Sequence, residues 1–312
     1  MSNLILSFTV VLPIFLELLL GYFLRMVGIF DFQTLRKLNK SVFRVFLPVL
    51  IFYNVYNSEI ADVFNPKLIV FSVSAILAVF FASLLIVPLI EKDNKKRGVL
   101  IQGIFRSNFV IFGIPLSTSL FSNDISGTAA VLVAVIIPLF NLLAVVVLEL
   151  FRGGKPNFQN IVIGILTNPL IIASAIGFAV LFSGFTLPPV ILKTVKEVSS
   201  VATPLALIVL GGSIDFKTVR GNLRPIAIGV IGKLIVTPIF ILGTAILLGF
   251  RDAEMAILLS LAASPVAVSS YIMAQQMGGD DDLAAQLQMF GTALCVFTVF
   301  IWIFILKQLG YM

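Results

Sequence analysis

The sequence predicts an all-α membrane protein, and three observations lead to that class. The chain of 312 residues is 59% hydrophobic, with a mean hydropathy of +1.12. Only 12% of its residues are charged, against about 25% in an average soluble domain. Uncharged stretches cover Leu68–Ile90, Ile125–Leu148, Met255–Gly279 and Leu283–Leu306, each long enough for a helix of about 20 residues to cross the hydrocarbon core. A soluble helical bundle is excluded, because it would need several long helices buried on all sides.

Ten transmembrane helices are expected in chain order. They are residues 4–26, 37–57, 67–90, 98–121, 126–150, 158–182, 189–213, 224–250, 254–277 and 283–307. The first contains Glu17 and lacks a basic leader and a small-residue cleavage site, so we interpret it as a span and not as a cleaved signal peptide. The loops between the spans are all too short to hold a soluble domain.

The placement of Lys and Arg predicts the orientation of the chain. Loops one, three, five and seven carry most of the basic residues, including Arg36, Lys95, Lys96 and Arg152. The positive-inside rule makes these loops cytoplasmic and both termini extracytoplasmic. The expected location is therefore the plasma (inner) membrane, crossed many times. The net charge of +6 reflects this orientation, and no nucleic-acid partner is expected.

The two halves of the chain resemble each other weakly. An offset of half the 312-residue length superimposes Pro13 on Pro169, Gly21 on Gly177 and Pro48 on Pro204. Five predicted spans lie on each side of about residue 155, which divides the chain into residues 1–155 and 156–312. Because each half has an odd number of spans, the second half enters the membrane from the opposite face. The result is a 5+5 inverted repeat, a common plan of secondary transporters.

Spans four and nine each contain a helix break with polar neighbours. Span four has Arg106, Ser107 and Asn108, with a predicted break at Gly113-Ile114-Pro115, and span nine has a predicted break at Ser264-Pro265. Unpaired backbone groups are costly in lipid, so broken helices usually line a cavity. We expect helices four and nine to cross near the bilayer midplane and to offer half-helix ends to a ligand. Two ordinary proline kinks are the structural alternative.

Four segments resemble the auxin efflux carrier family in its short bacterial form. They are FRVFLPVLIF at 43–52, RSNFVIFGIPL at 106–116, ATPLALIVLGGSI at 202–214 and KLIVTPI at 233–239. The resemblance implies a fold related to sodium–bile acid symporters, with a core of crossing helices beside a flatter scaffold. It also implies elevator-type transport of small organic anions such as malonate or malate. Ser264 departs from a symmetrical site, which would repeat Asn108 in span nine.

Three ionisable residues inside the spans each have two possible roles. Arg106 would pair with a substrate carboxylate or extend to the headgroups. Lys233 would contribute to the site or make a structural ion pair with Glu17. Glu17 would hold a coupling proton, because burial raises the pKa of a carboxyl group, or would complete that ion pair.

The predicted function is secondary active transport, by elevator-type alternating access, of mono- or dicarboxylates. An uncoupled anion channel and a transporter-like membrane receptor are the alternatives. An enzyme is not expected, because the chain has no His, a single cysteine, Cys295, and no evident nucleophile constellation. For the same reason no His/Cys metal site is expected.

The predicted site combines the residues above. The residues predicted to contact the substrate are Arg106, Asn108, Gly113, Ile114, Pro115, Lys233, Ser264 and Pro265; those predicted to bind a coupling ion are Glu17, Asn108 and Ser264. No cofactor is expected beyond Na⁺ or H⁺ as a coupling ion. The expected partners are a small organic anion, the lipid bilayer and a second copy of the chain in a homodimer.

Overall fold

The structure, a computed structural model, describes residues 2–58, 65–121, 126–153, 158–215 and 218–312, and these are 85% helical without a strand. The prediction of an all-α protein is confirmed. The helices, with η marking π-helical turns, are α1 Ser2–Met26, α2 Phe32–Ser41, η1 Val42–Phe46, α3 Leu47–Tyr56, α4 Pro66–Ile90, α5 Asn94–Phe105, η2 Phe109–Gly113, α6 Ile114–Leu120, α7 Ser126–Leu150, α8 Phe158–Thr167, α9 Pro169–Ser183, α10 Pro189–Ser213, α11 Val219–Ile231, η4 Gly232–Val236, α12 Thr237–Leu247, α13 Asp252–Ala263, α14 Val268–Met277 and α15 Asp281–Gln308.

Eight helices of the described chain are long and apolar enough to cross a membrane. Several of these spans consist of two shorter helices connected by a π-helical turn or a short interruption. Phe32–Tyr56 and Val219–Leu247 are examples. The bent pair α8–α9 would raise the number to nine. The 25-residue helix α1 is not in this set, so the ten-span count stays a prediction.

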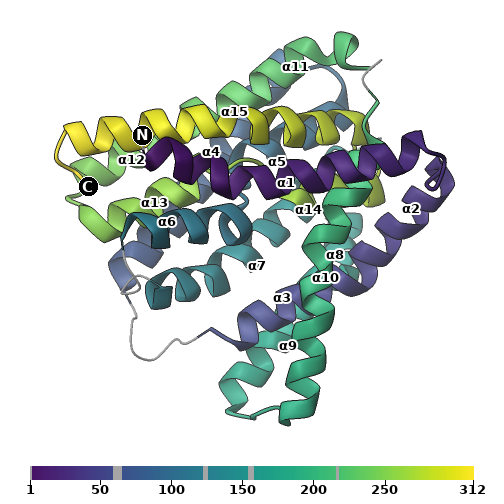
Figure 1. Ribbon diagram of the computed structural model, residues 1–312, viewed down its shortest axis with the longest axis horizontal. Coiled ribbons are helices and arrows are strands. Elements are labelled where there is room, and N and C mark those ends of the chain that lie inside the picture. The colour runs from purple at the N-terminus through teal and green to yellow at the C-terminus, as the bar shows by residue number, and fades with distance from the viewer. Residues whose placement is uncertain (1, 59–64, 122–125, 154–157, 216–217) are drawn as a thin grey trace.

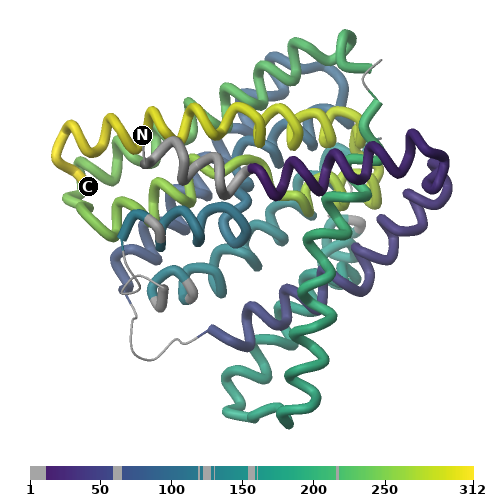
Figure 2. Tube along the Cα trace, in the orientation of Figure 1, coloured from purple at the N-terminus to yellow at the C-terminus, as the bar shows by residue number. Residues whose placement is uncertain are grey.

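The helices pack as two bundles that share a long boundary. Helices α1, α2–α3, α8–α9 and α10 form one bundle, whose strongest contacts are α1 with α10 and α3 with α9. Figure 1 shows α3, α9 and α10 projecting together below the rest of the molecule. The second bundle contains α4, α5–α6, α7, α11–α12, α13–α14 and α15, and in Figure 2 α15 runs beside the α11–α12 segment. We call these the first and second bundle.

Glycines bring helix backbones into contact within the first bundle. A Cβ atom on Gly21 of α1 would overlap the carbonyl of Ile208 in α10, and one on Gly211 would overlap the carbonyl of Leu18. A Cβ on Gly177 of α9 would lie 2.9 Å from Cβ of Val55 in α3. Small residues at such crossings are what let membrane helices approach closely.

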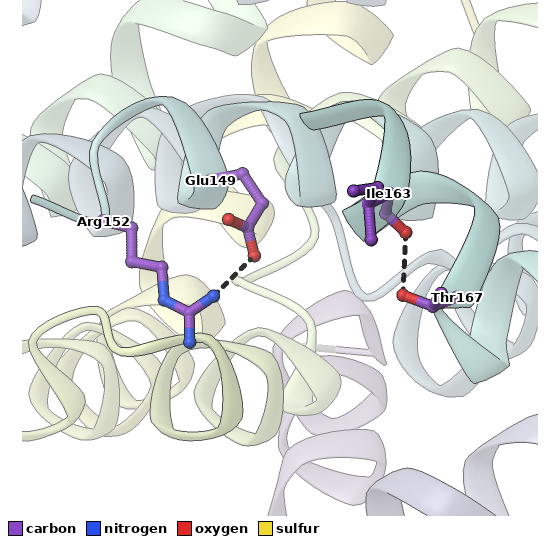
Figure 3. Close-up of polar contacts among 4 residues, drawn as sticks. All are labelled: Glu149, Arg152, Ile163 and Thr167. Carbon is purple, nitrogen blue, oxygen red and sulfur yellow. Dashed lines mark hydrogen bonds and ion pairs between the residues drawn. The ribbon is translucent and has the colours of Figure 1, made fainter. Parts of the chain in front are cut away.

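The α8–α9 segment is bent by 55°, whereas the sequence predicted one continuous span. The hydroxyl of Thr167 donates to the carbonyl of Ile163, 2.7 Å away, in the last turn of α8 (Figure 3). The side chain of Asn168 then accepts a hydrogen bond from the Leu170 N–H at 2.9 Å and caps α9, with Pro169 in the first helical turn. A cap and a first-turn proline start a new helix, so two helices form here.

The break in the fourth span lies at residues 106–108, and the prediction of a break at Gly113-Ile114-Pro115 is wrong. Pro115 falls in the first turn of α6, where a missing N–H is tolerated. The preceding turn is π-helical, and the N–H of Gly113 donates to the Asn108 carbonyl five residues earlier at 3.2 Å. The wider turn therefore carries the helix through the proline.

Several basic loops gather at one end of the molecule. Arg25 Nη1 donates to the carbonyls of Gly212 and Ile214, at 3.1 and 2.9 Å. Lys96 Nζ donates to Asn222 Oδ1 at 2.7 Å, and the Asp280 N–H contacts the Lys95 carbonyl at 3.5 Å. We call this end, with residues 25–31, 91–97, 218–224 and 278–281, the basic face.

Glu149 is a largely buried carboxylate held in an ion pair. Its side chain is 9% exposed and pairs with Nη1 of Arg152 at 3.2 Å, at the C-terminal end of α7 (Figure 3). The Arg152 side chain is 57% exposed. This ion pair covers a carboxylate that packs against Gly164 of α8, whose added Cβ would lie 3.0 Å from Glu149 Cγ.

Candidate functional site

The two broken spans are hydrogen-bonded to each other where their helices are interrupted. The Asn108 N–H, directly before η2, donates to the Pro265 carbonyl between α13 and α14 at 2.8 Å. The Ser107 hydroxyl donates to the Leu261 carbonyl near the end of α13. Extended backbone inside a bilayer is tolerated only where protein or water satisfies it. Each break supplies partners for the other, so the two spans meet at their breaks, as expected for helices four and nine.

A cavity of about 90 Å³ lies at this meeting point, on the boundary between the two bundles. Its polar lining consists of Asn54, Arg106, Ser107, Asn108, Asn141, Thr203 and Ser269; its apolar lining consists of Leu47, Leu50, Ile51, Phe109, Val110, Ile111, Ile137, Phe140, Ala206, Ala267 and Val268. Helices α3 and α10 contribute from the first bundle and the remainder comes from the second. The cavity wall thus contains both hydrogen-bonding groups and hydrocarbon groups.

Arg106 is the single ionisable side chain in this lining. It is 3% exposed. Its Nη2 donates to Asn141 Oδ1 at 2.6 Å and to Ser269 Oγ at 2.7 Å, and its Nη1 lies 2.7 Å from the weak acceptor Sδ of Met273. The guanidinium therefore points into the protein, and the alternative in which it extends to the headgroups is wrong.

No carboxylate neutralises Arg106 within the part of the chain that the structure describes. The ion pairs found there are Glu149–Arg152 and Lys193–Glu197. A buried charge costs several kcal/mol unless it is paired and hydrogen-bonded, and here the partners are neutral. An anion entering the cavity would supply the missing charge.

Two amide nitrogens in the cavity wall also lack partners. Asn108 is 4% exposed and Asn141 is fully buried, and Nδ2 of each has no hydrogen-bond acceptor among the described residues. Burying such a donor costs about 1–3 kcal/mol. Both are donors, so a ligand that accepts hydrogen bonds would satisfy them.

The helix N-termini at the breaks reinforce this preference. The π-turn η2 begins at Phe109 and α14 begins at Val268, and the first residues of both helices line the cavity. A helix N-terminus carries about half a positive charge and free N–H groups. Guanidinium, amide nitrogens and two helix starts thus all favour an anion.

Lys233 lies behind the cavity and not in its wall. It is 1% exposed, sits in η4, and its Nζ donates to the Ser107 hydroxyl. That hydroxyl in turn bonds to the Leu261 carbonyl. Among the described residues no ion pair joins Lys233 to Glu17, so the predicted structural pair is absent there. Lys233 supports the crossing by a chain of hydrogen bonds.

Five other predicted site residues are absent from the cavity lining, and three of them, Gly113, Ser264 and Pro265, make contacts at the crossing. They are Gly113, Ile114, Pro115, Ser264 and Pro265. A Cβ on Gly113 would lie 3.0 Å from the Ser260 carbonyl, so this glycine lets η2 approach α13. The Ser264 hydroxyl donates to the same carbonyl. The Pro265 carbonyl accepts from Asn108.

Glu17 is half-buried on α1, which packs against α10 and α15, and does not line the cavity. Asn54, Asn141 and Thr203 line the cavity but were not among the residues predicted to contact the substrate. The sequence feature that could have indicated Asn141 as a site residue is its position inside an uncharged span near Pro138. In the described residues no group of three His, Cys, Asp or Glu side chains could hold a metal ion.

Comparison with known proteins agrees with this architecture. A family model described as membrane transport protein matches residues 6–303. The chain belongs to this family. The match confirms the resemblance to the auxin efflux carrier family stated from the sequence.

Two archaeal relatives extend along almost the whole chain. An uncharacterized transporter of Methanocaldococcus jannaschii is 25% identical over 307 residues, covering 95% of this chain and 98% of the relative. An uncharacterized transporter of Methanothermobacter thermautotrophicus is 24% identical over 296 residues, covering 94% and 96%. This member of the membrane transport protein family is therefore a multi-pass membrane transporter.

Proposed function

We propose that this transporter is a secondary carrier for small organic anions and that the anion binds in the cavity at the crossing of spans four and nine. The single observation that carries the proposal is the buried guanidinium of Arg106, which lines the cavity and has no carboxylate partner among the described residues. An ionised group inside a membrane protein is expensive and usually functional. The cost is offset when an anion with the right geometry binds, and arginine suits a carboxylate because it can bond both oxygens.

The cavity further favours an anion with one charge and an apolar part. A monocarboxylate would place its carboxylate against Arg106 and the donors of Asn108 and Asn141, with its hydrocarbon against Ile51, Phe140 and their apolar neighbours. A dicarboxylate would bring a second charge to a wall that holds one cation. Of the two classes expected from the sequence, monocarboxylates fit better.

Alternating access by inverted repeats, residues 1–155 and 156–312, is part of the proposal. The half-length offset that pairs Gly21 with Gly177 also pairs Phe52 with Ile208. Gly21 packs on the Ile208 carbonyl, and a Cβ on Gly177 would lie 3.4 Å from the Phe52 carbonyl. The same contact therefore occurs between equivalent positions of the two halves, which supports an inverted 5+5 arrangement with α1 as the tenth span.

An elevator-type movement is supported by the position of the cavity. Arg106, Asn108 and Asn141 belong to the second bundle, while Leu47, Asn54 and Thr203 close the cavity from the first. In the proposed cycle the second bundle carries the bound anion past the first. We further propose a plasma-membrane location, cytoplasmic placement of the basic face, extracytoplasmic termini, and Na⁺ or H⁺ coupling in a homodimer.

Counterflow in liposomes tests the carrier function. Purified protein is reconstituted in vesicles loaded with one unlabelled mono- or dicarboxylate, and uptake of the labelled compound is followed. A carrier exchanges the two and accumulates label transiently, and the expected order is monocarboxylates before dicarboxylates. Equilibration of label without transient accumulation, or uptake that is the same in empty and loaded vesicles, would support the channel alternative. Sodium and proton gradients are then imposed one at a time to identify the coupling ion.

A further inference from the structure

A groove of about 670 Å³ lies on the outside of the second bundle and shares no lining residue with the anion cavity. It runs between α4 on one side and α11, η4 and α12 on the other, with Ile104 of α5 at its floor. Exposed apolar side chains surround it, including Leu85 at 72% and Leu89 at 84% exposure. This surface therefore faces lipid.

The groove offers no hydrogen bonds to a polar ligand along its length. Its two hydroxyl side chains are already satisfied, because Ser83 donates to the Val79 carbonyl at 2.6 Å and Thr237 contacts the Ile104 carbonyl at 3.4 Å. The remaining lining is apolar except at one end, where Arg224 lies. The occupant must therefore be a hydrocarbon chain with a polar group at one end.

Positive charge collects at that end of the groove, which opens at the basic face. Arg224 is exposed, and its Nη2 donates to the Ile90 carbonyl at 3.2 Å, at the end of α4. Arg97 donates to the Glu91 and Pro88 carbonyls at 2.6 and 3.1 Å. Two acids, Glu91 and Asp93, lie in the same loop, and each carboxylate accepts from the N–H groups of two backbone residues that follow it. Two guanidinium groups thus stand at the mouth.

The length of the groove matches one leaflet of a bilayer. From Ala78 to Ile90 on α4 the lining extends about 18 Å at helical rise, and half of a hydrocarbon core of about 30 Å is about 15 Å. The groove therefore starts at the membrane surface of the basic face and ends near the midplane. This length accommodates one acyl chain.

We propose that this groove is a binding site for an anionic phospholipid, with one acyl chain between α4 and α11–α12 and the headgroup phosphate at Arg224. The proposal does not depend on the transported anion. It also places the lipid against Gly232, next to Lys233 in η4, so lipid binding would bear on the turn that supports the crossing.

Native mass spectrometry of the purified full-length protein tests the site. The protein in detergent is titrated with phosphatidylglycerol and, separately, with phosphatidylcholine of the same acyl chains. We expect the anionic lipid to bind more tightly. Arg224→Gln should weaken that binding about fivefold, the effect of one basic residue near a lipid surface. Arg220→Gln, on the same helix but outside the groove, is the matched control.

A second pair of variants tests the acyl chain. Ala227→Phe fills the groove from an exposed position on α11 and should reduce binding of both lipids, whereas Ala179→Phe on the exposed side of α9 should not. Equal binding of the two lipids, equal effects of Arg224→Gln and Arg220→Gln, or loss of dimer and not of lipid with Ala227→Phe would each overturn the proposal.

Discussion

Arg106 and Asn141 are joined by a hydrogen bond of 2.6 Å that fixes both sides of the amide. The guanidinium has donors only, so it holds Oδ1 of Asn141 and leaves Nδ2 as a donor that has no partner in the described part of the chain. Because Arg106 bonds to the oxygen of Asn141, the amide nitrogen of Asn141 is left free to act as a second anion-binding group.

The first prediction compares the two buried bases. Arg106→Gln should weaken carboxylate binding at least about 30-fold, because removing one partner of a buried charge pair costs about 2–5 kcal/mol. Lys233→Gln should have a smaller effect, since Lys233 contacts Ser107 and does not line the cavity. Binding is measured with labelled monocarboxylates on monodisperse protein. Unchanged affinity in Arg106→Gln would refute the anion site.

The second prediction concerns the unpartnered amides. Asn108→Ala should reduce substrate binding by about 10- to 150-fold, the worth of a hydrogen bond to a charged group. Asn141→Ala should do the same and also release the Arg106 guanidinium. The matched control is Asn168→Ala, which loses the cap of α9, lowering the free energy of unfolding by about 1 kcal/mol with binding unchanged. If all three variants lose affinity equally, general destabilisation explains the result.

The third prediction addresses the first bundle. Gly21→Ala and Gly211→Ala should each lower the free energy of unfolding by about 1–3 kcal/mol, because the new methyl group overlaps a backbone carbonyl of the facing helix. Gly243→Ala should be neutral or stabilising by about 0.5–1 kcal/mol, since nothing lies within 4 Å of its added Cβ. Thermal denaturation in detergent measures all three. A loss in Gly243→Ala as large as in the others would contradict the packing argument.

The fourth prediction is a pH dependence at the basic face. Burial raises the pKa of Asp280 above its ordinary value of 3.8, although its side chain accepts from the Leu283 N–H and caps α15. The folded protein therefore binds a proton more readily than the unfolded chain, and stability falls as pH rises from 3.8 through the raised value.

Asp280→Asn keeps the capping oxygen and removes the charge. It should stabilise the protein at pH 7, with a gain that shrinks as the pH is lowered toward 3.8. Denaturation curves at several pH values give the difference between variant and wild type. A gain that does not change with pH would exclude titration of Asp280 as its cause.

The sequence predicted the helical class and the crossing of spans four and nine because both depend on composition and on local polar residues. It placed the fourth break wrongly, at Pro115, because proline was taken as the cause. The break falls at Arg106–Asn108, where the backbone bonds to Pro265. Such a bond between distant segments has no local signature.

The site was predicted only in part for the same reason. Arg106 and Asn108 stood out as polar groups inside an apolar span. Asn141 and Ser269 could be assigned only after the structure placed both within hydrogen-bond distance of one guanidinium. The side of the crossing on which Lys233 lies likewise depends on packing between η4 and the break.

The unneutralised charge of Arg106 has an electrical consequence for the proposed cycle. When an anion with one charge binds, the moving bundle loses its net charge at this site, and the membrane potential does no work on it there. When the site is empty, the guanidinium travels alone, and a potential of 100 mV acts on one elementary charge with up to about 2.3 kcal/mol. Binding of the anion would therefore remove one elementary charge from the work that the membrane potential does on the moving bundle.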